Sequence, residues 1–262
     1  MVGSVTALHA VGDGPADAPV LVMSGSLGST VDMWRPQLPA LTDRFRVVRI
    51  DPRGHGGSPA PDGPYRVADL AADVLALLDR LGLGRVDWCG LSLGAMVGMH
   101  LASRNPERIG RLALCCTSAH FPDSSAWRDR IDAVAAGGTA SIAPAVVARW
   151  FTPGWASAHP DVVAEAEAMV AGTSDVGYAA CCAALTVWDH RDLLPAIMAP
   201  TLVVAGADDL ATPVEPHART IVEGIPGARL EVVPGAHLAT VESAEAVNAL
   251  LREHLATSTG RR

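Results

Sequence analysis

Short apolar runs separated by longer stretches of helical periodicity restrict most strongly how this chain can fold. The runs are continuous rather than alternating, which is typical of central parallel strands that are covered on both faces. Alternation of such strands with helices indicates an α/β fold, with a mostly parallel central sheet flanked by helices. The expected strands are Pro19–Met23, Arg46–Asp51, Val86–Cys89, Leu112–Cys116, Thr201–Ala205 and Leu230–Val233.

Residues 117–199 lack strand patterns and are rich in alanine, which predicts a mainly helical segment. This segment is much longer than a crossover connection between neighbouring strands requires. We therefore expect residues 1–116 and 200–262 to form the core and residues 117–199 to form a helical cap that covers the site. The cap is inserted before the strand that leads to an acidic loop, and its last helix is expected to belong to the core.

Composition excludes several classes of partner. The net charge of −8 and the isoelectric point of about 5.5 argue against binding to nucleic acid or to an anionic membrane surface. The longest stretches without a charged residue, Trp88–Ser103 and Ala133–Ala148, are 16 residues each, which is too short to span a bilayer. The N-terminus does not resemble a secretory signal, and the five cysteines have neither zinc-site nor disulfide spacing. We expect a cytoplasmic protein without metal or cofactor.

The segment Gly90-Leu91-Ser92-Leu93-Gly94 has the G-x-S-x-G pattern between an expected strand and an expected helix. This context is typical of a nucleophile elbow, in which a serine is held in a strained turn. The residues two before and two after the serine must be small for the turn to close. Ser92 is therefore the candidate nucleophile, and a structural turn serine is the alternative.

A serine hydroxyl needs a histidine to take its proton and a carboxylate to orient that histidine. Asp208 and Asp209 follow one expected strand, and His237 follows the next, both at carboxyl ends where open α/β sheets place their sites. Two adjacent carboxylates repel each other if both point inward, and we favour Asp209 over Asp208. A helix N-cap or an exposed loop carboxylate remains the alternative for either aspartate, and a solvated loop residue is the alternative for His237.

An oxyanion hole requires two backbone N–H donors. Leu93 follows the nucleophile and is expected to supply one of them. The loop after the first central strand, Ser24–Ser29, consists mainly of glycine and serine and is expected to supply the other from Leu27. Ser26 in this loop is a candidate substrate-binding residue. A plain glycine-serine turn is the alternative for this loop.

The segment Asp51–Ser58 is rich in glycine but lacks the Lys-Ser/Thr of a phosphate-binding P-loop. We expect it to have a structural role, with Arg53 and His55 bracing neighbouring loops.

Together these motifs resemble the α/β-hydrolase superfamily, and within it the 3-oxoadipate enol-lactonases. The resemblance covers nearly the whole chain through the stretches SGSLGSTVDMWRPQLPAL, RIDPRGHGGSPAPDGPY, CGLSLGAMVG, RWFTPGW, GYAACCAAL, PTLVVAGADDLATP and GAHLATVESAEA. It implies an α/β-hydrolase fold, a triad of Ser92, Asp209 and His237, and hydrolysis of an enol-lactone through an acyl-enzyme. Neither a cofactor nor a macromolecular partner is implied.

The substrate of such an enzyme carries a free carboxylate. The expected cap contains arginines near tryptophans in the sequence, and these arginines could bind that carboxylate. The candidate substrate-binding residues are Trp127, Arg130, Arg149 and Trp150, and packing of the cap onto the sheet is the equally weighted alternative.

Three other functions remain open. A general carboxylesterase or lactonase and a cofactor-free perhydrolase would use the same triad, and a ligand receptor would keep the pocket without turnover. Dehalogenases and epoxide hydrolases are disfavoured because they need an aspartate at the position of Ser92. The expected ligand is a small lactone or ester, and the oligomeric state is not readable from the sequence.

Overall fold

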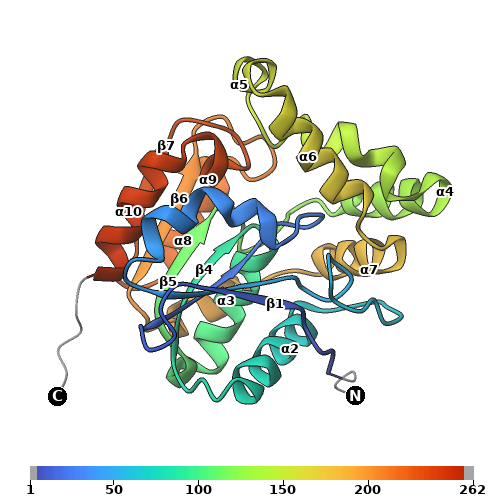
Figure 1. Ribbon diagram of the computed structural model, residues 1–262. Coiled ribbons are helices and arrows are strands. Elements are labelled where there is room, and N and C mark those ends of the chain that lie inside the picture. Colours follow the sequence, from blue (N-terminus) through green and yellow to red (C-terminus); the bar gives the residue numbers. More distant parts are fainter. Residues whose placement is uncertain (1–4, 257–262) are drawn as a thin grey trace.

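The computed structural model describes residues 5–256 and has a seven-stranded sheet at its centre (Figure 1). The strands are β1 (Ala10–Asp13), β2 (Val20–Ser24), β3 (Arg46–Ile50), β4 (Val86–Leu91), β5 (Ile109–Cys115), β6 (Thr201–Gly206) and β7 (Arg229–Val233). Their spatial order is β1-β3-β2-β4-β5-β6-β7, and β2 to β7 pair in parallel. The predicted α/β fold with a mostly parallel sheet is therefore confirmed.

Strand β1 is the one strand of the described chain that the sequence did not predict. It pairs antiparallel with β3 at an edge of the sheet, and its four residues are half-buried or exposed. An edge strand covered on one side does not need a continuous apolar run. Its pairing therefore depends on β3, which lies more than 30 residues further along the chain.

Helices cover both faces of the sheet (Figure 1). Helix α3 packs on β4 and β5 with α2 beside it, whereas α10 packs on β5 and against α1 and α9. Gly82, just past the last turn of helix α2, has a φ of 67°, which is typical of a residue that ends a helix. The bounds of these elements are η1 (Val31–Gln37), α1 (Leu38–Leu41), α2 (Val67–Arg80), α3 (Leu93–Arg104), η2 (Pro106–Arg108), η4 (Val214–Ala218), α8 (Arg219–Gly224), α9 (Ala239–Glu242) and α10 (Ala244–Ala256).

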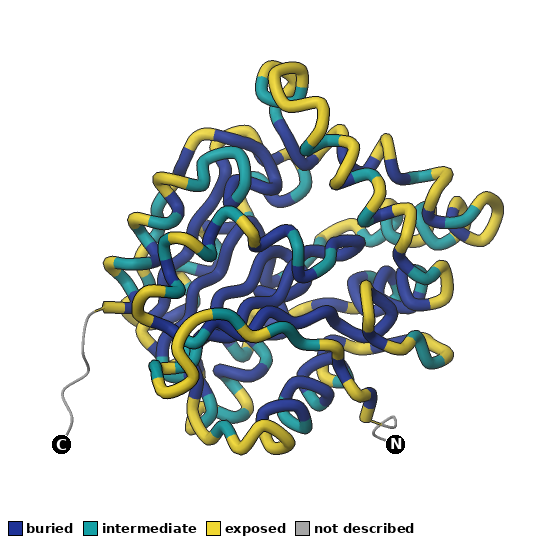
Figure 2. The backbone as a smooth tube through the Cα atoms, viewed as in Figure 1, coloured by how far each residue is buried: buried dark blue, intermediate teal, exposed yellow. Residues whose placement is uncertain are grey.

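Between β5 and β6 the chain is helical and contains no strand. Its elements are α4 (Ser125–Val147), α5 (Pro153–Ala158), α6 (Pro160–Ala171), α7 (Asp175–Thr186) and η3 (Arg191–Ala196). Helix α4 is kinked where Gly138 has a φ of 72°, and it packs against both α6 and α7. Helices α4 to α6 project beyond the sheet and carry much of the exposed backbone, whereas the central strands β2 to β6 are mostly buried (Figures 1 and 2). We call residues 117–199 the cap.

Within residues 5–256, no single helix is both long and apolar enough to cross a membrane. The only combination that satisfies this test is the pair α6 and α7, which is bent by 90° at its break.

The strand order reverses between β2 and β4, which is the topological switch point of the sheet. Strand β2 leads to β3 on one side, and the chain then returns to place β4 on the other side of β2. In open α/β sheets, ligands bind at the carboxyl ends of the strands beside such a point. The loops after β2 and β4 contact each other there, because the Gly94 N–H donates to the Gly25 carbonyl at 3.0 Å.

Candidate active site

Ser92 lies in a strained turn between β4 and α3. Its φ and ψ are 53° and −111°, a region that a residue with a side chain rarely occupies. The flanking glycines are required by packing. A Cβ atom on Gly94 would lie 2.0 Å from the Ser24 carbonyl oxygen, and one on Gly90 would lie 2.4 Å from the Ala95 nitrogen. The local structure is that of a nucleophile elbow.

His237 and Asp209 meet across the loops that follow β7 and β6. Nδ1 of His237 lies 2.9 Å from Oδ2 of Asp209, and both side chains are at most 5% exposed. A carboxylate only accepts hydrogen bonds, so Nδ1 donates and Nε2 is left as the acceptor that faces the cavity. This orientation is the one that a general base next to Ser92 requires.

The two neighbouring aspartates have different environments. Asp208 is exposed, whereas Asp209 also accepts hydrogen bonds from the N–H groups of Ala211 and Thr212, at 2.8 and 3.0 Å, and from the Thr212 hydroxyl at 2.7 Å. Oδ2 of Asp209 therefore binds both the histidine and the Thr212 hydroxyl, and Oδ1 holds the backbone of its own loop. Burial alone would raise the pKa of Asp209, but His237 and Thr212 outweigh it and hold this pKa well below its usual range.

The hydroxyl that contacts Nε2 of His237 belongs to Ser26. The Ser26 Oγ lies 3.5 Å from Nε2, at the outer limit of a hydrogen bond, and within the described residues none joins His237 to Ser92. Catalytic hydrogen bonds are commonly long without substrate and shorten when it binds. Ser26 thus lies beside the histidine, in the loop that also carries Leu27.

The backbone N–H groups of Leu27 and Leu93 are both available as donors. Neither is engaged in a hydrogen bond with another residue of the range 5–256. Leu93 is the first residue of α3, where the N–H has no partner within the helix. The loop after β2 and the elbow are therefore suited to bind an oxyanion.

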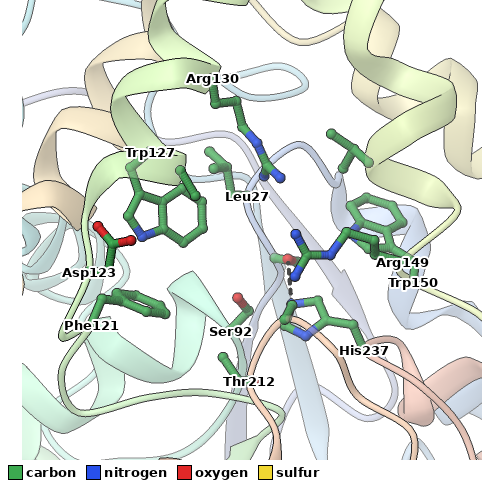
Figure 3. Close-up of a pocket in the computed structure, with 14 residues that line it drawn as sticks. Leu27, Ser92, Phe121, Asp123, Trp127, Arg130, Arg149, Trp150, Thr212 and His237 are labelled. Carbon is green, nitrogen blue, oxygen red and sulfur yellow. Dashed lines mark hydrogen bonds between the residues drawn. The ribbon is translucent and has the colours of Figure 1, made fainter.

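A cavity of about 180 Å³ lies over Ser92 and is lined on its outer side by residues of the cap (Figure 3). It brings together all the sequence-predicted site residues except Asp209, which lies behind His237, and Leu93. Lining residues that the sequence analysis named are Ser26, Leu27, Ser92, Trp127, Arg130, Arg149, Trp150 and His237. Those it did not name are Phe121, Asp123, Ala126, Val146, Ala211 and Thr212.

The two cap arginines point their guanidinium groups into this cavity from different sides (Figure 3). Arg130 is half-buried, lies 5.2 Å from the centre of the Trp127 ring, and donates to the buried Tyr178 hydroxyl at 3.3 Å. Arg149 is exposed and donates to the Leu210 carbonyl at 2.7 Å. Asp123 is the one carboxylate among the described residues that line the cavity, so cations outnumber anions in this lining.

Among the residues that the sequence analysis missed, Thr212 and Phe121 have identifiable contacts. Thr212 holds Asp209, and its position three residues after the aspartate is a typical capping spacing. Phe121 packs edge-on against Trp127 with ring centres 5.1 Å apart. No local pattern identifies Phe121, because its place at the cavity depends on the path of the cap.

Polar contacts join the cap to the histidine loop. The Leu238 N–H donates to the Trp150 carbonyl at 2.8 Å. Glu242 accepts from the Ala236 N–H at 3.0 Å, from the Thr152 N–H at 3.2 Å and from the Thr152 hydroxyl. The segment that carries Arg149 and Trp150 is thereby attached to the loop that carries His237.

The segment Asp51–Ser58 contributes no residue to the cavity. Arg53 binds Asp73, and His55 accepts a hydrogen bond from the loop that contains Leu27. The segment has the expected structural role, but only His55 braces a loop, because the partner of Arg53 lies in helix α2. In residues 5–256 there is also no group of three or more His, Cys, Asp or Glu side chains arranged to hold a metal ion.

Comparison with known proteins finds a matching family and several similar enzymes. Residues 18–244 match the family described as alpha/beta hydrolase fold. The chain is 39% identical over 235 residues to 3-oxoadipate enol-lactonase 2 of Acinetobacter baylyi, covering 90% of this chain and 88% of that protein. It is 32% identical over 251 residues to RutD of Stutzerimonas stutzeri, named as a candidate carbamate hydrolase, covering 93% and 94%. The solved enol-lactonase of Burkholderia xenovorans LB400 has a TM-score of 0.93 and 39% identity, covering 96% of this chain and 97% of that one.

Proposed function

The chain belongs to the α/β-hydrolase family, and on this premise we propose that it is a serine hydrolase that opens an enol-lactone carrying a free carboxylate. The observation that carries the proposal is one cavity that joins Ser92 and His237 to the guanidinium groups of Arg130 and Arg149. The similarity to enol-lactonases supports the same substrate class. 3-Oxoadipate enol-lactone fits it, because one of its two carboxyl groups closes the ring and the other stays free.

In the first half of the proposed reaction, Ser92 Oγ attacks the ring carbonyl carbon while Nε2 of His237 takes the hydroxyl proton. The N–H groups of Leu27 and Leu93 bind the oxyanion of the tetrahedral intermediate. Asp209 stabilises the imidazolium that forms, because its carboxylate accepts from Nδ1 at 2.9 Å.

The intermediate collapses when the bond from the carbonyl carbon to the ring oxygen breaks. The leaving group is an enolate, whose charge is delocalised, so it depends less on the proton from His237 than an alkoxide does. It takes up a proton to become the ketone while His237 releases the proton taken from Ser92 and becomes neutral again, and the product stays attached through the acyl group on Ser92. His237 then activates a water molecule that attacks the ester, and the product acid leaves with Ser92 restored.

The free carboxylate is bound in this proposal by Arg130, with Arg149 at the mouth of the cavity. An arginine forms two parallel hydrogen bonds to a carboxylate, and such a charged contact contributes about 1.5–3 kcal/mol where water is partly excluded. Trp127 and the half-buried Phe121 provide the apolar wall beside Arg130. The cap thus selects the substrate, and the core carries out the chemistry.

A carbamate hydrolase is the second candidate, supported by the 32% identity to RutD. General esterase, lactonase and perhydrolase activities on the same residues also belong in the test. We place them after the enol-lactone because two cations next to the nucleophile favour an anionic substrate over a neutral ester.

The test is a turnover panel with purified protein. It contains the enol-lactone, its methyl ester, γ-butyrolactone, p-nitrophenyl acetate, carbamate with ammonia release as the readout, and peroxide with acetate. The Ser92→Ala variant supplies the background, since enol-lactones also open spontaneously. We expect kcat/KM for the enol-lactone to exceed that for its methyl ester by at least about tenfold.

Equal or better turnover of the neutral esters would replace this proposal with a general esterase. Carbamate as the best substrate would favour the second candidate. Turnover of none of these compounds above the Ser92→Ala background would favour a ligand receptor.

A further inference from the structure

The loop after β2 contains a tight turn with Leu27 and Gly28 at its centre. The Ser29 N–H donates to the Ser26 carbonyl at 3.0 Å, and Gly28 has a φ of 85° whereas Leu27 does not have a positive φ. These features define a type II turn. Its central peptide, between Leu27 and Gly28, is rotated by about half a turn relative to that of a type I turn.

Two hydrogen bonds hold this turn, one on each side of Leu27. The Gly25 carbonyl accepts from the Gly94 N–H at 3.0 Å, which ties the loop to the nucleophile elbow. The Gly28 N–H donates to Nε2 of His55 at 2.9 Å. The second contact holds the central peptide and comes from a segment that takes no part in the proposed chemistry.

The hydrogen bonds of His55 determine its protonation. Nε2 must accept, because the Gly28 N–H can only donate, and Nδ1 must donate, because its partner is the Arg53 carbonyl at 3.1 Å. The ring is therefore neutral, with its proton on Nδ1. The side chain is fully buried, and this burial lowers the pKa of His55 despite the Arg53 carbonyl and the nearby Asp51, so the neutral form is stable near pH 7.

The segment behind His55 is itself rigidly held. Nε and Nη2 of Arg53 each lie 2.6 Å from a carboxylate oxygen of Asp73, which is fully buried. The backbone of Gly54 is packed so closely on α7 that a Cβ atom there would lie 2.5 Å from the Gly177 Cα. His55 is therefore a fixed acceptor at which the turn can be held.

From these contacts we infer that His55 is a positioning residue for the oxyanion hole: it anchors the Leu27–Gly28 peptide and thereby fixes the backbone at Leu27, whose own N–H, on the preceding peptide, is the proposed oxyanion donor. This inference deepens the proposed function and rests on it, since Leu27 is an oxyanion donor only if Ser92 forms a tetrahedral intermediate.

Removing the acceptor leaves the Gly28 N–H buried and unpaired. Such a group destabilises the folded state, so the backbone of the turn shifts toward water or toward another acceptor. Either movement displaces Leu27. The ground-state contacts made by Arg130 and Trp127 come from α4 and do not change.

The experiment compares His55→Leu, which removes the acceptor, with His55→Gln, whose amide oxygen reaches about as far as Nε2. His190→Leu is the matched control, because His190 is also buried and its Nε2 lies 2.9 Å from Ser103 Oγ, away from the cavity. Four quantities are measured: kcat, KM, the inhibition constant of phenylboronic acid, and the hydrogen-exchange rate of the Gly28 amide by NMR.

In His55→Leu we expect kcat to fall about 10- to 100-fold with KM changed less than about threefold, since one oxyanion donor contributes about 10²–10³ in kcat. Boronate affinity falls by a similar factor, and Gly28 exchange becomes at least about tenfold faster. His55→Gln recovers most of both losses. His190→Leu shows no selective loss of kcat and no faster Gly28 exchange.

Unchanged Gly28 exchange in His55→Leu would overturn the inference, and so would faster exchange with normal kcat and normal boronate affinity. An equal loss of kcat and boronate affinity in His190→Leu would also overturn it, because general destabilisation would then explain the effect of His55→Leu. If the unmodified enzyme turns over none of the panel, the proposed function fails instead, while the exchange measurement still reports whether His55 holds the turn.

Discussion

The loops of the core and the helices of the cap meet at one cavity but are built differently. Asp209 of the core is buried and accepts four hydrogen bonds from three neighbouring residues. Arg149 of the cap is exposed and makes one hydrogen bond to the acid loop, and Arg130 makes one to Tyr178. The core groups are held in place before substrate arrives, whereas the cap groups retain unused donors for a ligand.

This difference indicates which region stabilises the transition state and which region selects the substrate. Groups that stabilise a transition state must be oriented in advance, because reorganisation during the reaction raises the barrier. Groups that choose a substrate need only a charge and a shape, and they tolerate some movement. Changes in the core loops should therefore reduce turnover of every substrate, and changes in the cap should reduce turnover of some.

The largest expected effect tests the core through its nucleophile. Ser92→Ala should lower kcat at least about 10⁴-fold for charged and neutral substrates alike, because no other described group replaces the attacking oxygen. A fluorophosphonate probe should label the parent protein once, at Ser92, as located by peptide mass spectrometry. Labelling of another residue, or retained activity in the variant, would remove Ser92 from the mechanism.

A slightly smaller effect distinguishes the two aspartates of one loop. Asp209→Asn should lower kcat by about 10³- to 10⁴-fold, because an amide no longer holds His237 in the required tautomer. Asp208→Asn is the matched control on the exposed neighbour and should cost less than about tenfold. The measurement is kcat for both variants with the best substrate of the panel, and reversed effects would make Asp208 the acid.

Substitution of the cap arginines is expected to reduce turnover of the charged substrate selectively. Arg130→Met should lower kcat/KM for the enol-lactone by about 10- to 150-fold and hardly change it for the methyl ester. Arg149→Met should have a smaller effect in the same direction, because that side chain is exposed and screened by water.

The control for both is Arg128→Met, on the exposed side of the same helix as Arg130. The ratio of the two activities is the quantity to compare. If neither Arg130→Met nor Arg149→Met changes this ratio, the cap does not select for charge.

The smallest effect is expected where the two regions are joined. Glu242→Gln leaves at least one of the Thr152 and Ala236 donors with a poorer partner, which should lower the free energy of unfolding by about 1–3 kcal/mol. We expect kcat to fall less than about tenfold for all substrates. Urea unfolding and the substrate panel measure these effects, with Glu245→Gln on the exposed surface as the control. A loss confined to the enol-lactone would mean that this contact serves specificity.

Much of the fold followed from patterns within a few residues. A continuous apolar run predicts a buried parallel strand wherever it occurs, so the six central strands were located to within about three residues. The missed strand β1 depends on pairing with β3 and on no local signal of its own. The cavity shows the same contrast between local patterns and distant contacts. The sequence identified Trp127 and Arg130 as lining residues, but it did not identify Phe121 and Val146.

The sequence by itself determined the elbow around Ser92, because the steric demand of a tight turn selects the two glycines locally. It also determined the order of serine, aspartate and histidine along the chain. Only the tertiary structure decided which aspartate lies beside His237, how far each arginine is buried, and that His55 supports the loop of Leu27. Those properties depend on contacts between segments distant in sequence, whose distances are set only when the sheet and the cap have packed.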